Sequence, residues 1–271
     1  FSLLLTQASE DFNCSDISPT IFGAVFESTL NPETRRKGGM HYTSIENIHK
    51  VIDPLFLNDL RSELDEIKQV SAAKTRQKRL TAFQDKLASL KFLDPACGSG
   101  NFLTETYLSL RKLENEALSM LLGGQITFDL ENLSPIKVSI KQFYGIEIND
   151  FAATVAKTAL WIAESQMMKQ TEDIVHMNLD FLPLKTYVNI VEGNALRIDW
   201  ESVVPKAELN YIMGNPPFVG YTYQSVTQKA DLQSVEPDIG KNIDYVAGWY
   251  FKAAQFMIGT TIRTAFVSTN S

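Results

Sequence analysis

FLDPACGSGNF, residues 92–102, is the stretch that decides the fold of this chain. Its apolar start, Phe92 to Asp94, reads as a short buried strand, and the residues from Phe102 onward have the apolar spacing of a helix. Gly98 and Gly100 permit a tight turn between the two and a close approach of the backbone to a ligand. Free N–H groups at the start of the helix favour an anionic or polar ligand. The stretch therefore predicts a strand, a ligand-binding glycine loop and a helix.

Short apolar runs and helical stretches alternate after Lys91, which is typical of parallel strands joined by crossover helices. We expect a doubly wound α/β sheet over residues 91–271, with ligands at the carboxyl ends of its strands. The expected strands are Phe92–Asp94, Phe143–Ile148, Asn189–Val191, Tyr211–Met213 and Thr264–Ser268, and the expected helices are Phe102–Leu121, Phe151–Met168 and Tyr245–Ile258. The interval between the first two strands is long, and we expect a loop insertion from Gly123 to Ser139.

Residues 1–90 are expected to form a helical lead-in. Ile45, Ile48, Val51 and Ile52 lie on one apolar stripe, and a longer stripe runs from about Leu55 to Leu90. An acidic and lysine set, Asp53 with Glu66 to Lys68, superficially resembles a nuclease site. It falls on the continuous helix expected here rather than on paired strands, so nuclease activity is not expected.

The composition is that of an ordinary globular protein, with 271 residues, 44% hydrophobic and 21% charged. Its formal net charge of -7 argues against a surface that grips nucleic acid all over, because phosphate contacts require Lys and Arg. Two cysteines are too few for a disulfide framework, so a reducing cytoplasm is expected. No apolar run reaches the roughly 18 residues of a membrane span, and a start on Phe rather than Met suggests a fragment.

Polar residues follow the second and third expected strands. Glu147 ends the second, where a carboxylate with both oxygens free could accept the two hydroxyls of a ribose. Asn194 follows the third, and its amide could pair with the edge of an adenine ring. Standing alone, Glu147 is equally compatible with a surface glutamate at the end of a strand. An isolated Gly-Asn pair at Asn194 indicates only a turn.

Asn215-Pro216-Pro217-Phe218 follows the fourth expected strand and is the most specific element of the sequence. The two prolines remove two N–H donors and fix φ, which leaves carbonyls as acceptors. The Asn215 side-chain oxygen and the Pro216 carbonyl could both accept hydrogen bonds from one exocyclic NH2, making its nitrogen nucleophilic. Phe218 supplies a ring on which a base could stack. The loop thus predicts methyl transfer to a planar amino group.

The sequence lacks the residues that several other kinds of site require. His41, His49 and His176 have no metal-ligand spacing, so no metal site is expected. No Gly-Lys-Ser/Thr follows the glycine loop, which excludes a P-loop. A cytosine-C5 methyltransferase needs a cysteine beside a proline after the fourth strand, and neither Cys14 nor Cys97 lies there.

These motifs and their order resemble the γ-class amino-methyltransferases of DNA, in particular the methyltransferase core of MmeI-like single-chain restriction-modification enzymes. The resemblance covers nearly the whole chain and rests on Pro19–Gly23, Arg35-Arg36, Gly39–Ser44, Asp94–Phe102, Gly145–Glu147, Gly193–Leu196, Asn215–Phe218, Asp244–Ala247 and Ala265–Asn270. It implies a Rossmann-like, class I sheet that binds S-adenosylmethionine (SAM) and methylates adenine N6 in double-stranded DNA.

The resemblance also implies roles for individual residues. Thr43 and the Asp94 to Gly100 loop would hold the methionine part of SAM, Glu147 its ribose and Asn194 its adenine, while Asn215 and Phe218 would hold the flipped target adenine. The full cofactor set it implies is Thr43, Asp94, Ala96, Gly98, Gly100, Asn101, Phe102, Glu147, Ile148, Asn194, Ala195 and Asn215, and the catalytic set is Asn215, Pro216, Pro217 and Phe218. Many relatives carry Asp at position 194 and Tyr at position 218.

The family continues past the fifth strand into a target-recognition domain, so we expect that domain to lie outside this chain and the fragment to bind SAM but methylate DNA poorly. Three alternatives stay open: N4 of cytosine, the amino group of a protein glutamine or an RNA base, and a regulatory module that binds SAM without catalysis.

Overall fold

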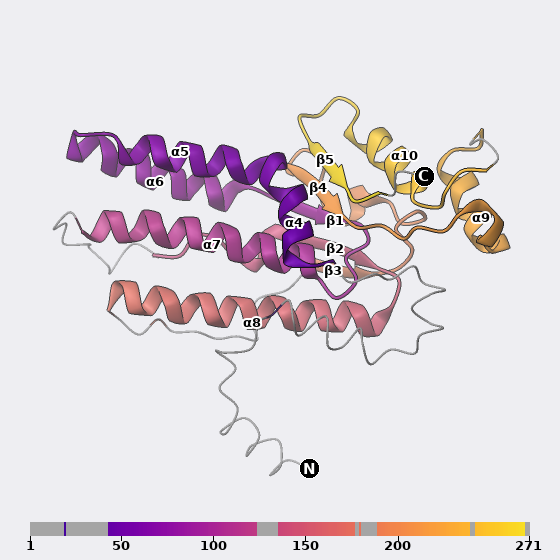
Figure 1. Ribbon diagram of the computed structural model, residues 1–271, viewed down its shortest axis with the longest axis horizontal. Coiled ribbons are helices and arrows are strands. Elements are labelled where there is room, and N and C mark those ends of the chain that lie inside the picture. The colour runs from indigo at the N-terminus through magenta and orange to yellow at the C-terminus, as the bar shows by residue number, and fades with distance from the viewer. Residues whose placement is uncertain are drawn as a thin grey trace, which may run out of the picture.

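The structure is a computed structural model that describes residues 19, 43–123, 135–176, 179, 189–238 and 242–268. Its sheet has five parallel strands in the order β3-β2-β1-β4-β5 (Figure 1). The strands are β1 (Phe92–Asp94), β2 (Phe143–Glu147), β3 (Asn189–Glu192), β4 (Tyr211–Gly214) and β5 (Arg263–Phe266). The strand order reverses between β1 and β4, which makes this the switch point of the sheet. The expected doubly wound α/β fold is confirmed.

Three aromatic residues keep the central strands in register. Phe92 on β1 is paired with Phe143 on β2 and with Tyr211 on β4. The Phe92 ring stacks on both neighbours, with centroids 5.3 Å from Phe143 and 5.4 Å from Tyr211. Because the strands are parallel and start level, their carboxyl ends meet at one edge, where Asp94 and Glu147 lie.

The sheet is buried on both faces, as expected of parallel strands. Side chains alternate along a strand, so Phe92 enters one apolar core and Leu93 the other. The first core is closed by the lead-in together with α7 (Asn101–Leu122) and α8 (Asp150–Val175), and the second by α9 (Val226–Val235) and α10 (Ala247–Met257). Figure 1 shows the long helices α5 to α8 layered together, away from α9 and α10.

The described part of the lead-in that adjoins the sheet domain, residues 43–90, is helical, but it is not one continuous stripe. It consists of α4 (Ile45–Ile52), a π-helical turn η2 (Asp53–Leu57), α5 (Asn58–Lys68) and α6 (Ala73–Ser89). The expected single run from Leu55 to Leu90 is wrong, because the chain leaves the helix after Lys68 and α6 packs back on α5. This reversal lets Leu64 of α5 and Phe83 of α6 bury themselves in the same core. The nuclease-like set is helical, as expected.

Several boundaries differ from the sequence expectations. The strand β2 stops at Glu147, so Ile148 is outside it and exposed. The helix α8 extends to Val175, and α9 was not expected at all. Most of the expected insertion after Gly123 lies outside the described residues, as do Cys14, His41, residues 20–23, 35–36, 39–42 and 269–270. Among the described residues, none of the helices combines the length and apolarity that crossing a membrane requires.

Candidate functional site

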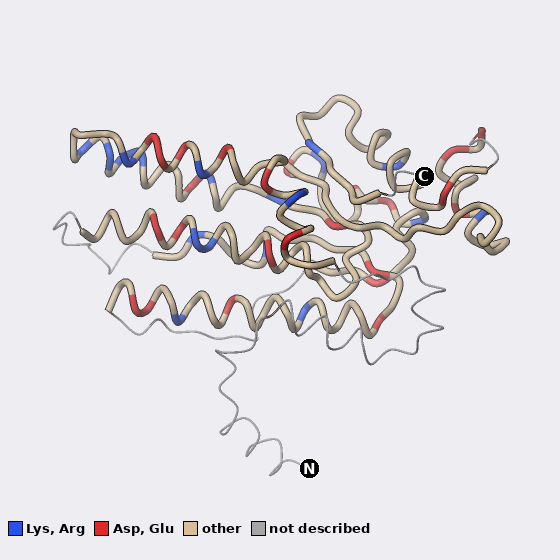
Figure 2. Tube along the Cα trace, in the orientation of Figure 1, with Lys and Arg blue, Asp and Glu red and all other residues tan. Residues whose placement is uncertain are grey.

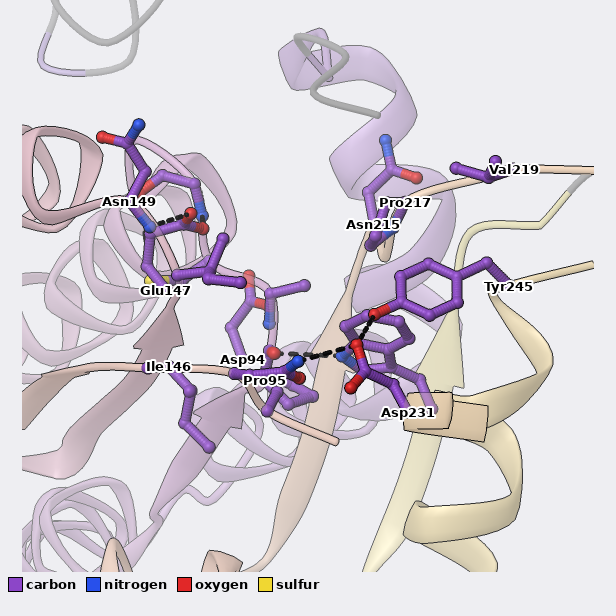
Figure 3. Close-up of a pocket in the computed structure, with 18 of the residues that line it drawn as sticks. Asp94, Pro95, Ile146, Glu147, Asn149, Asn215, Pro217, Val219, Asp231 and Tyr245 are labelled. Atoms are coloured by element: carbon purple, nitrogen blue, oxygen red, sulfur yellow. Dashed lines mark hydrogen bonds between the residues drawn. The ribbon is translucent and has the colours of Figure 1, made fainter. Parts of the chain in front are cut away.

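A cavity of about 780 Å³ opens at the carboxyl ends of the strands (Figure 3). Its size is in the range of pockets for nucleotide-sized ligands. It is lined by twelve of the residues singled out in the sequence: Thr43, Asp94, Ala96, Gly98, Asn101, Phe102, Glu147, Ile148, Asn194, Ala195, Asn215 and Pro217. Gly100, Pro216 and Phe218 are not among its lining residues. The lead-in, the glycine loop and the Asn215 loop therefore meet at one site.

The glycine loop has the backbone that its sequence predicts. Gly98 and Gly100 have positive φ angles of 53° and 84°. A Cβ on Gly100 would lie 2.8 Å from the Cβ of Ala156 on α8, so this glycine allows α7 to start against α8. Its contribution in the structure is close packing, whereas Gly98 lies at the cavity wall.

Two acidic side chains, Glu147 and Asp94, accept N–H groups of this loop. The Glu147 oxygens accept the N–H groups of Gly98, at 2.8 Å, and Asn149, at 2.9 Å. The expectation that both oxygens are free is therefore wrong. Asp94 is buried and accepts the Ala96 N–H at 3.0 Å. Burial, with a smaller contribution from the Glu147 charge, raises the pKa of Asp94 to about 8.

Both the nitrogen and the oxygen of the Asn194 side-chain amide form hydrogen bonds within the protein. Its Nδ2 donates to Asp231 Oδ2 at 2.9 Å, and its Oδ1 accepts the Leu196 N–H at 2.9 Å. Asp231 lies on α9, is 2% exposed and also accepts hydrogen bonds from Arg197 and from the Tyr245 hydroxyl. Burial and the Asp231 carboxylate raise the pKa of Tyr245. Asp231 and Tyr245 line the cavity (Figure 3).

Sequence reasoning missed Asp231 because it assigned no element to α9. Tyr245 lies in Asp244–Ala247, one of the segments that resemble the family, but no role at the site was predicted for it.

Asn215 is held from the other side by the lead-in. Its Nδ2 donates to Thr43 Oγ1 at 3.0 Å, across 172 positions of sequence. Thr43 is fixed because it precedes Ser44, the N-cap of α4, and the Ile48 and Ile52 side chains of that helix are fully buried. Asn215 Oδ1 is buried at the cavity and has no hydrogen-bond partner among the described residues. The same holds for Asn101 Oδ1. Two residues that line the cavity therefore each have a buried oxygen without a hydrogen-bond partner among the described residues.

Close approach of β4 to β1 sets the position of Asn215. A Cβ on Gly214 would lie 2.4 Å from Asp94 Oδ1, so only glycine lets the end of β4 lie against that carboxylate. Nearby, His49 pairs with Asp53 and Glu105. In the part of the chain that the structure describes, no three His, Cys, Asp or Glu side chains are grouped as metal ligands would be.

A parallel sheet of this order, with a glycine loop after β1 and an Asn-Pro-Pro-Phe loop after β4, defines the methyltransferase class of doubly wound domains. The family model for the MmeI DNA-methyltransferase domain matches residues 70–271. The chain belongs to this family, and the resemblance to MmeI-like enzymes is confirmed.

Individual relatives agree with this assignment. DNA methyltransferase A of Bacillus subtilis is 40% identical over 99% of this chain and 30% of its own length. A putative type II restriction enzyme and methyltransferase of Methanocaldococcus jannaschii is 27% identical over 79% of this chain and 19% of its own. The solved type IIL restriction-modification enzyme MmeI, in complex with DNA, is 45% identical, with a TM-score of 0.85 over 94% of this chain and 34% of its own. The chain thus spans about a third or less of these relatives.

Proposed function

We propose that this chain is the catalytic part of a restriction-modification protein and transfers a methyl group from SAM to the exocyclic N6 amino group of an adenine flipped out of double-stranded DNA. The observation that carries the proposal is that Asn215 lines the cavity and that its buried Oδ1 has no hydrogen-bond partner among the described residues. A buried acceptor without a donor is costly, roughly 1–3 kcal/mol, unless a ligand supplies one. An exocyclic NH2 is such a donor.

The described residues fit SAM as the cofactor. Asn101 Oδ1, the second unpartnered acceptor, suits an ammonium group such as that of the methionine part. Glu147 is a carboxylate at the cavity wall, a group that accepts ribose hydroxyls, and the start of α7 lies at the cavity with Gly98 and Asn101. When bound, SAM supplies an electrophilic methyl group.

The chain's own residues would prepare the amino group. Asn215 Oδ1 accepts one of its N–H bonds, and we expect the Pro216 carbonyl to accept the other, which draws the nitrogen toward tetrahedral geometry and exposes its lone pair. The Thr43 hydroxyl accepts from Nδ2, which fixes the orientation of the amide and leaves Oδ1 as its acceptor for the amino group. We expect Phe218 to stack on the flipped base, which offsets part of the few kcal/mol needed to extrude it.

The DNA partner is proposed from the family and from the solved complex of MmeI. The alternatives are methylation of cytosine N4, methylation of the amino group of a protein glutamine or an RNA base, and a regulatory module that binds SAM without catalysis. Experiments on the methylated product distinguish them.

The test compares Asn215→Ala with Asn47→Ala, an exposed asparagine on α4. The genome-encoded protein is incubated with tritiated SAM and unmethylated genomic DNA, and SAM affinity is measured by calorimetry. We expect Asn215→Ala to keep SAM affinity and to lose transfer by about a hundredfold or more, as when other groups that stabilise developing charge are removed. Asn47→Ala should behave as wild type. Unchanged transfer by Asn215→Ala would refute the proposal.

A further inference from the structure

The segment that follows the Asn215 loop forms part of the cavity mouth. We call residues 219–229 the rim segment; it contains the short 3-10 helix η5 (Tyr221–Tyr223) and the first turn of α9. Five of its residues line the cavity: Val219, Tyr223, Ser225, Thr227 and Gln228. The rim segment therefore forms part of the same cavity wall as Asn215.

The rim segment has a fixed backbone. Gln224 is 7% exposed, and its Nε2 donates to the carbonyls of Val219 and Ile243, each at 2.8 Å. Ser225 and Gln228 form a capping box that starts α9. These bonds fix the turn through polar groups, without any need for its apolar side chains to pack inward.

Two apolar side chains point into solvent from this turn. Tyr223 and Val226 are each 86% exposed, one on either side of the buried Gln224. Burying them would stabilise the fold, yet the anchored turn holds both in water. Exposed apolar side chains in a segment that lines a pocket are suited to contact a ligand or partner.

The charge of the segment favours a polyanion. From Asn215 to Ala230 the sequence has no Asp or Glu, and Lys229 is its only charged residue, in a chain of net charge -7. The Lys229 ammonium lies 4.2 Å from the centroid of the Tyr221 ring. Figure 2 shows the stretch between β4 and α9 without charged residues, whereas α5 and α6 carry both charges along their length. Aromatic and apolar tips beside a lone cation match bases beside a phosphate.

We propose that the rim segment contacts the DNA duplex at the place from which the adenine is extruded. Tyr223 and Val226 pack on bases left unstacked there, and Lys229 faces a neighbouring phosphate. This inference rests on the proposed function, because the position of the flipped adenine defines where the duplex has an unfilled space.

The test uses the genome-encoded protein, tritiated SAM and unmethylated genomic DNA. The double variant Tyr223→Ala/Val226→Ala is compared with Tyr223→Phe, which keeps the ring, and with Ile258→Ala, which removes a 74% exposed side chain away from the cavity lining. We expect kcat/KM for DNA to fall about tenfold to a hundredfold in the double variant, with SAM affinity and Tm unchanged. Tyr223→Phe and Ile258→Ala should match wild type.

Lys229→Gln adds a readout of the phosphate contact. Its DNA affinity should depend less steeply on salt, with the slope of log K against log salt smaller by about one. A double variant with the kcat/KM of wild type would overturn the inference. A double variant that loses SAM affinity or Tm along with kcat/KM would also overturn it, because such losses indicate a structural role. If wild-type protein transfers no methyl group to DNA, the proposed function itself fails.

Discussion

Replacing Thr43 by valine tests whether the lead-in orients the catalytic amide. Valine keeps the shape of threonine but removes the hydroxyl that accepts from Asn215 Nδ2 at 3.0 Å. Nδ2 then loses its partner in a site where Thr43 is 8% exposed. An unsatisfied buried donor costs roughly 1–3 kcal/mol, which corresponds to about a 5- to 150-fold shift between the two orientations of the amide. The flipped amide would present a donor to the amino group.

We therefore expect Thr43→Val to lower kcat at saturating SAM by about tenfold to a hundredfold, and Thr43→Ser to restore most of it. Initial rates of tritium transfer give kcat and the KM for SAM separately. Thr43 is also predicted to contact SAM, and that role alone would raise the KM. A wild-type kcat with only a raised KM in Thr43→Val would refute the positioning role.

Two further predictions concern stability. Because the pKa of Asp94 is raised to about 8 from its ordinary 3.8, the folded state holds a proton that the unfolded state loses. The stability that this group contributes is full below about pH 4 and is lost as pH rises to about 8, with stability falling as pH increases. Urea unfolding at pH 5 and pH 8 should show this loss in wild type and a smaller one in Asp94→Asn; equal losses would contradict it. Gly100→Ala should destabilise more than Gly259→Ala, since both have positive φ but only Gly100 has a neighbour within 4 Å of the added Cβ. Equal shifts in Tm would show that the contact with Ala156 relaxes.

The sheet and the loops at its edge were predictable because local sequence determines them. The stretch from Phe92 to Phe102 contains its own strand, turn glycines and helix start, and the prolines after Asn215 fix φ wherever they occur. Register among the strands also brings together the residues that end different strands, as with Asp94 on β1 and Glu147 on β2. Pattern and the family resemblance together therefore predicted twelve residues of the cavity wall.

The pairings between distant side chains could not be predicted in this way. The bond between Thr43 and Asn215 depends on how the lead-in docks, and docking is decided by buried residues such as Ile48 and Ile52. The turn between α5 and α6 contains no glycine or proline from which it could have been predicted. Helix α9 has weak apolar periodicity, so Asp231 and its bond to Asn194 were invisible in the sequence.

The most direct test of the central claim is the identity of the methylated base. DNA methylated in vitro by the genome-encoded protein, with SAM carrying a deuterated methyl group, is digested to nucleosides and analysed by mass spectrometry. The account predicts the label in N6-methyladenine, absent from the Asn215→Ala reaction. Label in N4-methylcytosine, or no labelled nucleoside from DNA despite measurable SAM binding, would contradict it.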